Sequence, residues 1–290
     1  MGNLYEWSVK RQTIVRCYKD LMDYGISSMA ISTNKKQLFV SGYDGLLKRI
    51  TLGQFPKVED FRKEKMAVWS IACGKEDRFL FTSGKEKAEL KQISISTKTK
   101  VYDYTKEIKN STINCLLVTH DNEFLFVAGK KTLDQIHIRS RNKVETFYHV
   151  GTNLICMTVD RYNKNLYVGD IDGTITIIKI RKYNRKKQHK EIGAYPMRSI
   201  LVTGDGKKLF VASGQKRGTL KIIDTKKFSV LRDFGPIHEN VIYHMVFSMK
   251  ENTLITSCMS GYLKEWSLKK NYKLIKDHGK IDLSGICSLC

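Results

Sequence analysis

The sequence has little of what would divide a chain or anchor it in a membrane. Only 3 of its 290 residues are proline, and no stretch rich in proline, glycine and serine interrupts it. No apolar run approaches the roughly 18–20 residues that a membrane-spanning helix needs, and the N-terminus lacks the apolar core of a signal peptide. We therefore expect a single domain over residues 1–290 and no membrane span.

Catalytic and metal-binding motifs are also missing. The seven histidines are scattered, without the His-x-x-x-His spacing of paired metal ligands. There is no Gly-x-Ser-x-Gly turn and no glycine-rich phosphate loop followed by Lys-Ser or Lys-Thr. Cys287 and Cys290 have a Cys-x-x-Cys spacing, but in a strand they would point to opposite faces. We expect no enzyme activity, no cofactor, no metal site and no small-molecule substrate.

Acidic residues are scarce beside basic ones. The chain has 29 Asp and Glu against 51 Lys and Arg, which gives a formal net charge of +22. Such a charge attracts polyanions if the cations gather on one face. A compositionally biased genome would also produce a chain rich in Lys, Ile, Asn and Tyr, so the charge alone does not distinguish a binding face from a bias.

What the sequence does have is a repeat of about 43 residues. An aliphatic residue is followed three positions later by Ile or Trp at seven places: Leu4/Trp7, Leu47/Ile50, Leu90/Ile93, Leu133/Ile136, Ile175/Ile178, Leu220/Ile223 and Leu263/Trp266. The first members are 43, 43, 43, 42, 45 and 43 residues apart. A period of this size indicates a repeat architecture in which each unit buries its apolar surface against its neighbours.

Two further series of apolar segments run in phase with these pairs. One begins at Ile26, Val68, Ile113, Leu154, Met197, Ile242 and Ile286, and the other at Leu38, Leu80, Leu125, Leu166, Leu209 and Leu254. A weaker fourth segment follows each pair. Short β-branched and aromatic segments between Gly, Asn, Asp and Lys clusters are typical of strands joined by tight turns. Four strands per unit predict an all-β, seven-bladed-type β-propeller of four-stranded antiparallel blades, with the first series innermost.

Several segments resemble the WD-repeat family of β-propellers. Residues 238–248 resemble the family's Gly-His-led stretch, and residues 261–267 and 2–8 resemble its closing strand. Asp44-Gly45 and Asp172-Gly173 match its turn between the second and third strands. Most units lack the Gly-His pair, and two of seven have the Trp. The resemblance implies that the family's His–Ser/Thr–Asp–Trp hydrogen-bond network is absent or partial in most blades.

The two ends of the chain do not complete the seventh unit. The chain opens on an expected third strand (4–8) and fourth strand (14–18) and stops on an expected first strand (286–290). First and third strands cannot pair directly at the strand spacing of about 4.8 Å. We therefore expect six complete blades and a seventh that lacks a strand. Either the chain is part of a longer polypeptide, which we favour, or the seventh blade keeps an exposed edge.

Five of the seven cysteines fall in the segments expected to be innermost: Cys73, Cys115, Cys156, Cys287 and Cys290. Buried free cysteines suit a reducing environment. We expect the protein in the cytoplasm or another reducing intracellular compartment.

In a propeller, the first-to-second and third-to-fourth connections of each blade share one rim, which we term the bottom face. Most of these connections carry Lys or Arg, and the longest spans residues 181–190. The candidate polyanion-binding residues are Arg181, Lys182, Arg185, Lys186, Lys187 and Lys190. RNA, acidic protein tails and anionic surfaces are the partners that such a face would attract.

The other two sets of connections share the opposite rim, the top face. Tyr24, Met66 and Tyr195 each precede an expected innermost strand by two residues. They are candidates to dock another protein, because aromatic side chains dominate binding hot spots. The alternative is that they only cap neighbouring blades, and burial distinguishes the two roles.

The resemblance implies a non-catalytic scaffold that binds other proteins, of identity unknown, within a larger assembly. The alternative is a binder of polyanions through the bottom face, and a third class is a structural element of a larger polypeptide. Salt separates the first two, because polyanion binding weakens steeply as ionic strength rises.

Overall fold

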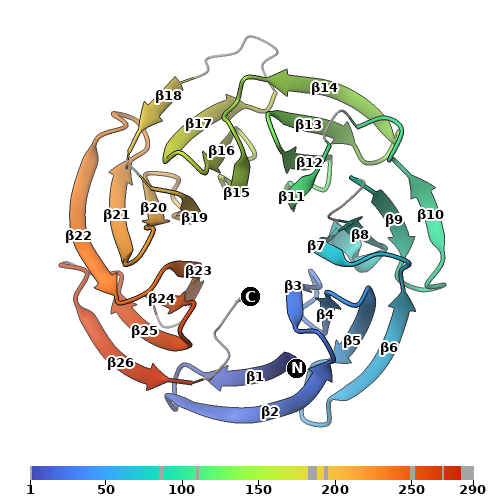
Figure 1. Cartoon of the computed structure of the whole chain (residues 1–290), viewed down its shortest axis with the longest axis horizontal. Coiled ribbons are helices and arrows are strands. Elements are labelled where there is room, and N and C mark those ends of the chain that lie inside the picture. The colour runs from blue at the N-terminus through green and yellow to red at the C-terminus, as the bar shows by residue number, and fades with distance from the viewer. Residues whose placement is uncertain are drawn as a thin grey trace.

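The computed structural model describes residues 2–84, 88–108, 111–181, 188–192, 195–248, 252–269 and 271–281. In these ranges the chain forms strands β1 to β26 and one short 3-10 helix, Lys75–Asp77. The strands build seven sheets that stand as blades around a ring (Figure 1). Six sheets have four antiparallel strands each, which confirms the all-β propeller predicted from the repeat.

The first strand of each complete blade lies nearest the centre of the ring (Figure 1). These strands, in blades one to six, are β3 (Ile26–Ile31), β7 (Val68–Cys73), β11 (Ile113–Val118), β15 (Leu154–Val159), β19 (Met197–Val202) and β23 (Ile242–Ser248). Each begins at the residue that the sequence predicted. Neighbouring innermost strands contact one another around the ring.

The second strands form the most buried layer. They are β4 (Gln37–Gly42), β8 (Phe79–Gly84), β12 (Phe124–Gly129), β16 (Asn165–Asp170), β20 (Lys208–Ser213) and β24 (Thr253–Cys258). Successive side chains of a strand point to opposite faces, and each blade is covered by a neighbour on both faces. Their sequences are therefore almost continuously apolar, as in Leu38-Phe39-Val40.

The third strands explain the repeated pairs. They are β5 (Leu46–Thr51), β9 (Leu90–Ser94), β13 (Thr132–His137), β17 (Thr174–Lys179), β21 (Gly218–Asp224) and β25 (Tyr262–Ser267). Residues three apart in a strand point to opposite faces. Leu47 therefore packs with Ile93 in the core between blades one and two, while Ile50 packs with Leu4 in the core between blades seven and one. In blades one to five, each pair thus supplies one residue to each of two adjoining cores.

The fourth strands form the outer wall of the ring (Figure 1). They are β6 (Lys57–Lys63), β10 (Lys100–Asp103), β14 (Asn142–Tyr148), β18 (Gln188–Glu191), β22 (Val230–His238) and β26 (Leu274–Lys280). Basic side chains of this wall reach the neighbouring blade. Arg62 donates to the Lys98 carbonyl at 2.9 Å, and Arg232 to the Asn271 carbonyl at 2.6 Å. These bonds tie adjacent blades together at their outer ends.

The seventh sheet contains β1 (Gly2–Ser8) and β2 (Thr13–Met22) in the described part of the chain. They match the predicted third and fourth strands of that blade. Leu4, Leu21 and Met22 pack against Ile26 and Leu38 of blade one, so this blade joins the ring on that side. The first strand expected at 286–290 lies outside the described residues.

The cysteines of the innermost strands lie where the sequence placed them. Cys73, Cys115 and Cys156 are on β7, β11 and β15. Cys287 and Cys290 lie outside the described residues. Among the helices that the structure describes, none is long and apolar enough to cross a membrane.

Candidate functional site

Backbone hydrogen bonds place the two kinds of bottom connection of each blade beside each other. The first residue after each complete third strand donates to the turn between the first and second strands: Leu52 to Lys36, Ile95 to Arg78, Ile138 to Glu123, Ile180 to Lys164, Thr225 to Lys207 and Leu268 to Asn252, at 2.7–3.0 Å. Each pair of connections is thus joined by one bond. The bottom face is therefore a regular rim.

Exposed cations are distributed around this rim. Those that the structure describes include Lys10, Arg11, Lys35, Lys36, Arg139, Arg161, Lys164, Lys207, Lys226, Lys227 and Lys269. Several carboxylates of the same rim, among them Asp160, Asp205 and Asp224, accept backbone amides. Asp224 accepts the amides of Lys226 and Lys227 at 2.9 and 2.6 Å, and these bonds, the Lys227 amide first, hold its pKa below the usual value. The lysine side chains of this turn therefore remain available to a ligand.

The predicted polyanion loop is only partly described. Arg181 is exposed, and its guanidinium binds Asp121 at 2.7 Å and Glu123 at 3.1 Å on blade three. Arg181 thus joins blade four to blade three through carboxylates that sequence reasoning did not assign to it. Lys182, Arg185, Lys186 and Lys187 lie outside the described residues. Lys190 is on β18, opposite Ile175, and its side chain is not among those described.

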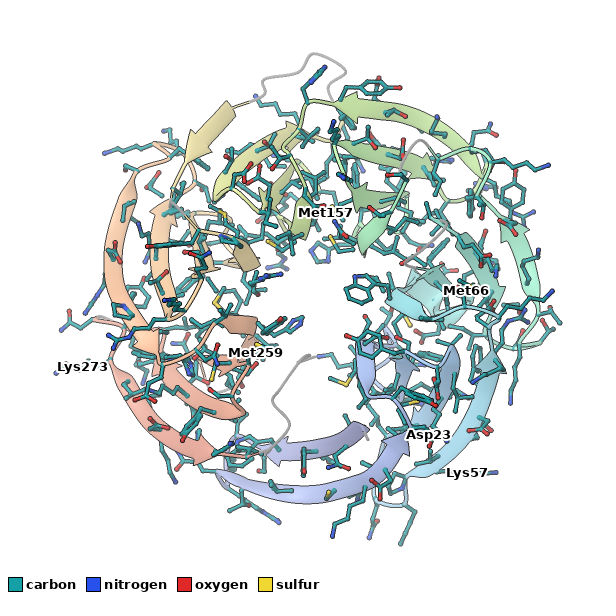
Figure 2. The ribbon with its side chains drawn as sticks, in the orientation of Figure 1. Asp23, Lys57, Met66, Met157, Met259 and Lys273 are labelled. Atoms are coloured by element: carbon teal, nitrogen blue, oxygen red, sulfur yellow. The ribbon has the colours of Figure 1, made fainter. Side chains whose placement is uncertain are left out.

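On the top face, Tyr24 is 74% exposed, Tyr195 is 45% exposed and Met66 is half-buried. None of the three is enclosed by its own chain. Figure 2 shows Met66 on the same side of the ring as Asp23, the neighbour of Tyr24. Tyr195 belongs to the connection that leads into β19 of blade five, across the ring from blade one (Figure 1). The three candidates therefore do not form one cluster.

The structure adds two aromatic residues to this region of the top face. The rings of Tyr43 and Trp69 are 5.5 Å apart between centroids, and the Tyr43 amide donates to the Gly25 carbonyl at 3.4 Å. Gly45 has a φ of +80°, and a Cβ there would lie 2.7 Å from the Met66 carbonyl. We term Tyr24, Tyr43, Met66 and Trp69 the rim cluster; its members lie on the top of blades one and two.

Sequence reasoning assigned Tyr43 to a turn and Trp69 to an innermost strand, so it missed their role in the rim cluster. The available signal was the phase of the repeat, which puts Tyr43 in a top-face turn. The contact between the two rings joins different blades, and only their packing shows it.

A buried hydrogen-bond network holds blade six. The Trp266 indole donates from Nε1 to the Thr256 hydroxyl at 3.0 Å, and the same hydroxyl lies 2.8 Å from Nε2 of His238. The other ring nitrogen of His238 is buried without a hydrogen-bond partner. Burial, with a smaller effect of Lys264, lowers the pKa of His238 to about 4. His238 is therefore a neutral structural residue near neutral pH.

No protein-family model matches the chain, and no curated protein matches it significantly.

Proposed function

We propose that the protein is a non-catalytic scaffold that binds other proteins through its top face, as part of a larger assembly. The observation that carries this proposal is the rim cluster, in which Tyr24 and Tyr43 are 74% and 42% exposed. Large aromatic residues at the surface are costly to leave in water and are enriched among residues that dominate protein interfaces.

We also infer that the chain is a divergent relative of the WD-repeat family. The bonds among His238, Thr256 and Trp266 support this, because they join the His, Thr and Trp of the family's network. The unpartnered Nδ1 of His238 agrees with the lack of the family's Asp in that blade.

A reducing intracellular location, such as the cytoplasm, is part of the same proposal. Cys115 and Cys156 lie on innermost strands, and both are free thiols. Burial raises the pKa of Cys115 to about 12, so its thiol stays protonated and unreactive. Thiols kept in this state serve as small apolar core residues.

The scaffold proposal predicts that replacing Tyr24 and Tyr43 with alanine removes specific partners. Each hot-spot truncation should weaken binding about 30-fold, equivalent to about 2 kcal/mol. The measurement is quantitative affinity purification from the native cell, followed by dissociation constants for each recovered protein.

Tyr162→Ala is the matched control for this experiment. Tyr162 is 62% exposed in a bottom-face turn of blade four. Its replacement therefore removes an aromatic residue of equal size from the opposite rim. Equal loss of partners in both variants, or no loss in either, would reject the top face as the docking surface.

A second candidate function is polyanion binding through the bottom face, favoured by its exposed lysines and by carboxylates such as Asp224 that bind backbone amides. Replacing Arg181, Lys182, Arg185, Lys186 and Lys187 with Gln should weaken binding to RNA or acidic peptides. Each lost phosphate contact should flatten the salt dependence by about one unit of slope. Titrations from about 50 to 200 mM salt measure this.

The control removes five charges from the top face, through Gln at Lys65, Lys130, Lys131, Lys216 and Arg217. Either set of five substitutions should lower the free energy of unfolding by under about 0.5 kcal/mol, because exposed ion pairs and surface charges contribute little to stability. If wild-type protein shows no salt-sensitive binding near 150 mM salt, the charge reflects composition and solvation only.

A further inference from the structure

The outer strands of three neighbouring blades carry an exposed aliphatic pair at the same register position. The pairs lie on β22, β26 and β2 of blades five, six and seven, and their side chains are 42–51% exposed: Val230-Leu231, Leu274-Ile275 and Ile14-Val15. We term these six residues the outer stripe. The first member of each pair lies opposite the last member of a repeated sequence pair on the third strand: Val230 opposite Ile223, Leu274 opposite Trp266 and Ile14 opposite Trp7. The stripe therefore repeats once per blade.

Other blades have different residues at this register position. Lys100 and Lys143 occupy it in blades two and three, opposite the repeated isoleucines. Blade one has Val58 there, followed by Glu59. The fold therefore does not require an exposed aliphatic pair at this position. Single exposed apolar residues are ordinary on a protein surface, but the same exposed pair in three adjoining blades indicates a contact surface.

Hydrogen bonds between blades hold the pairs of the stripe at fixed positions relative to one another. The basic residue after each pair donates to the connection that precedes the next outer strand: Arg232 to the Asn271 carbonyl at 2.6 Å, Lys276 to Oε1 of Gln12 at 2.9 Å and Arg16 to the Gln54 carbonyl at 3.3 Å. The last of these bonds reaches blade one, where Phe55 follows Gln54 and is exposed. The stripe is therefore a built feature of the outer wall beside the bottom face.

The stripe is bordered by positive charge. Arg232 and Lys276 bind neutral acceptors, whereas the carboxylates that follow them, Asp233 and Asp277, bind lysines of the third strands at 3.3 and 3.2 Å. Figure 2 shows Lys273, the neighbour of Leu274, at the outer margin of the ring. The connections that lead into the three outer strands add exposed cations: Lys10, Arg11, Lys226, Lys227, Lys269 and Lys273. A ligand complementary to this surface therefore combines apolar groups with acidic ones.

The three pairs also face different directions, because β22, β26 and β2 lie at successive positions around the ring (Figure 1). A flat membrane cannot contact all three pairs at once, whereas an extended peptide can follow the curve of the wall. A second copy of this chain would bring positive charge against positive charge. Segments that are disordered until they bind are able to wrap a large surface of this kind.

We propose that the outer stripe binds an extended acidic segment of a partner protein, with aliphatic residues over the pairs of successive blades and carboxylates between them. The aliphatic contacts supply the affinity, and the carboxylates select the partner and guide it to the surface. The stripe lies on the outer wall and not on the top face, so this proposal does not rest on the proposed scaffold function.

The probe is a set of fluorescent peptides with three Leu-Val pairs separated by runs of Glu, Ser and Gly. Runs of about six to ten residues reach at most about 20–36 Å, so the set samples different distances between blades. At about 150 mM salt, the best of these peptides should bind the full chain about 10–100-fold more tightly than its form with Ser-Ser for each Leu-Val. Its form with Gln for Glu should also bind more weakly, and with less dependence on salt. Fluorescence anisotropy measures both differences.

Two triple variants of the chain make this test specific. Replacing Ile14, Val230 and Leu274 with Gln should reduce binding of the Leu-Val peptide to the level of its Ser-Ser form, at unchanged net charge. The fold should tolerate this change, because blades two and three carry Lys at the same position. A second form with Thr at the three positions keeps β-branched or similar side chains suited to strands and should show the same loss. The matched control replaces three other exposed apolar residues with Gln and should bind like the wild type: Ile31, Ile171 and Met259.

Three results would overturn the proposal. If no Leu-Val peptide binds more tightly than its Ser-Ser form, the stripe does not recognise aliphatic residues. A wild-type dimer that the Gln variant converts to a monomer in analytical ultracentrifugation would assign the stripe to a second copy. Binding to vesicles containing phosphatidylserine that the Gln variant abolishes would assign it to a membrane. None of these results depends on the rim cluster, so failure here and failure of the scaffold proposal are distinguishable.

Discussion

Replacing Phe210 with alanine is expected to lower the free energy of unfolding by about 3–5 kcal/mol. Phe210 is 1% exposed on β20, and its ring contacts Phe247 and Tyr272 of blade six at centroid distances of 5.3 and 5.9 Å. The truncation would leave a cavity between two blades whose backbones are fixed by their own sheets. Denaturant unfolding followed by circular dichroism measures the loss.

Phe55→Ala is the matched control for Phe210→Ala. Phe55 is 86% exposed in the bottom connection between β5 and β6, so its removal should change stability by under about 0.5 kcal/mol. A loss at Phe210 as small as that at Phe55 would show that the cores between blades do not carry the stability of the ring.

Acidification is expected to destabilise the protein through His238 before its carboxylates protonate. The pKa of His238 is about 4 in the folded protein against 6.5 in the unfolded chain. Between these values the unfolded chain binds a proton that the folded protein does not, so stability is complete above pH 6.5 and falls towards pH 4. The loss between pH 7.5 and pH 5 should be about 2 kcal/mol.

His238→Gln should flatten this dependence, because glutamine cannot titrate. The quantity to compare is the slope of the unfolding free energy against pH, which separates titration from the loss of the Thr256 contact. His120→Gln, at an exposed bottom-face position, should keep the wild-type slope. An unchanged slope in His238→Gln would show that another group carries the acid sensitivity.

The bottom face shows how local sequence and packing contribute different information. The position of each lysine-bearing turn followed from the repeat, because tight turns and strand alternation are decided by neighbouring residues. The ion pairs that Arg181 makes with blade three did not follow from the repeat. Its carboxylate partners, Asp121 and Glu123, lie about 60 residues earlier and come within reach only because adjacent blades share a rim.

The sequence by itself determined that the chain folds into repeated blades of strands. The spacing of three within pairs such as Leu47/Ile50 already required one residue on each face of a strand, and the period of about 43 required equal units that cover one another. Only the tertiary structure decided which contacts the same residue type makes in different blades. Trp7 and Trp266 close nearly identical segments, yet only Trp266 has an acceptor for its indole hydrogen. Hydrogen bonding across a sheet depends on which strand lies alongside, and no local pattern specifies that neighbour.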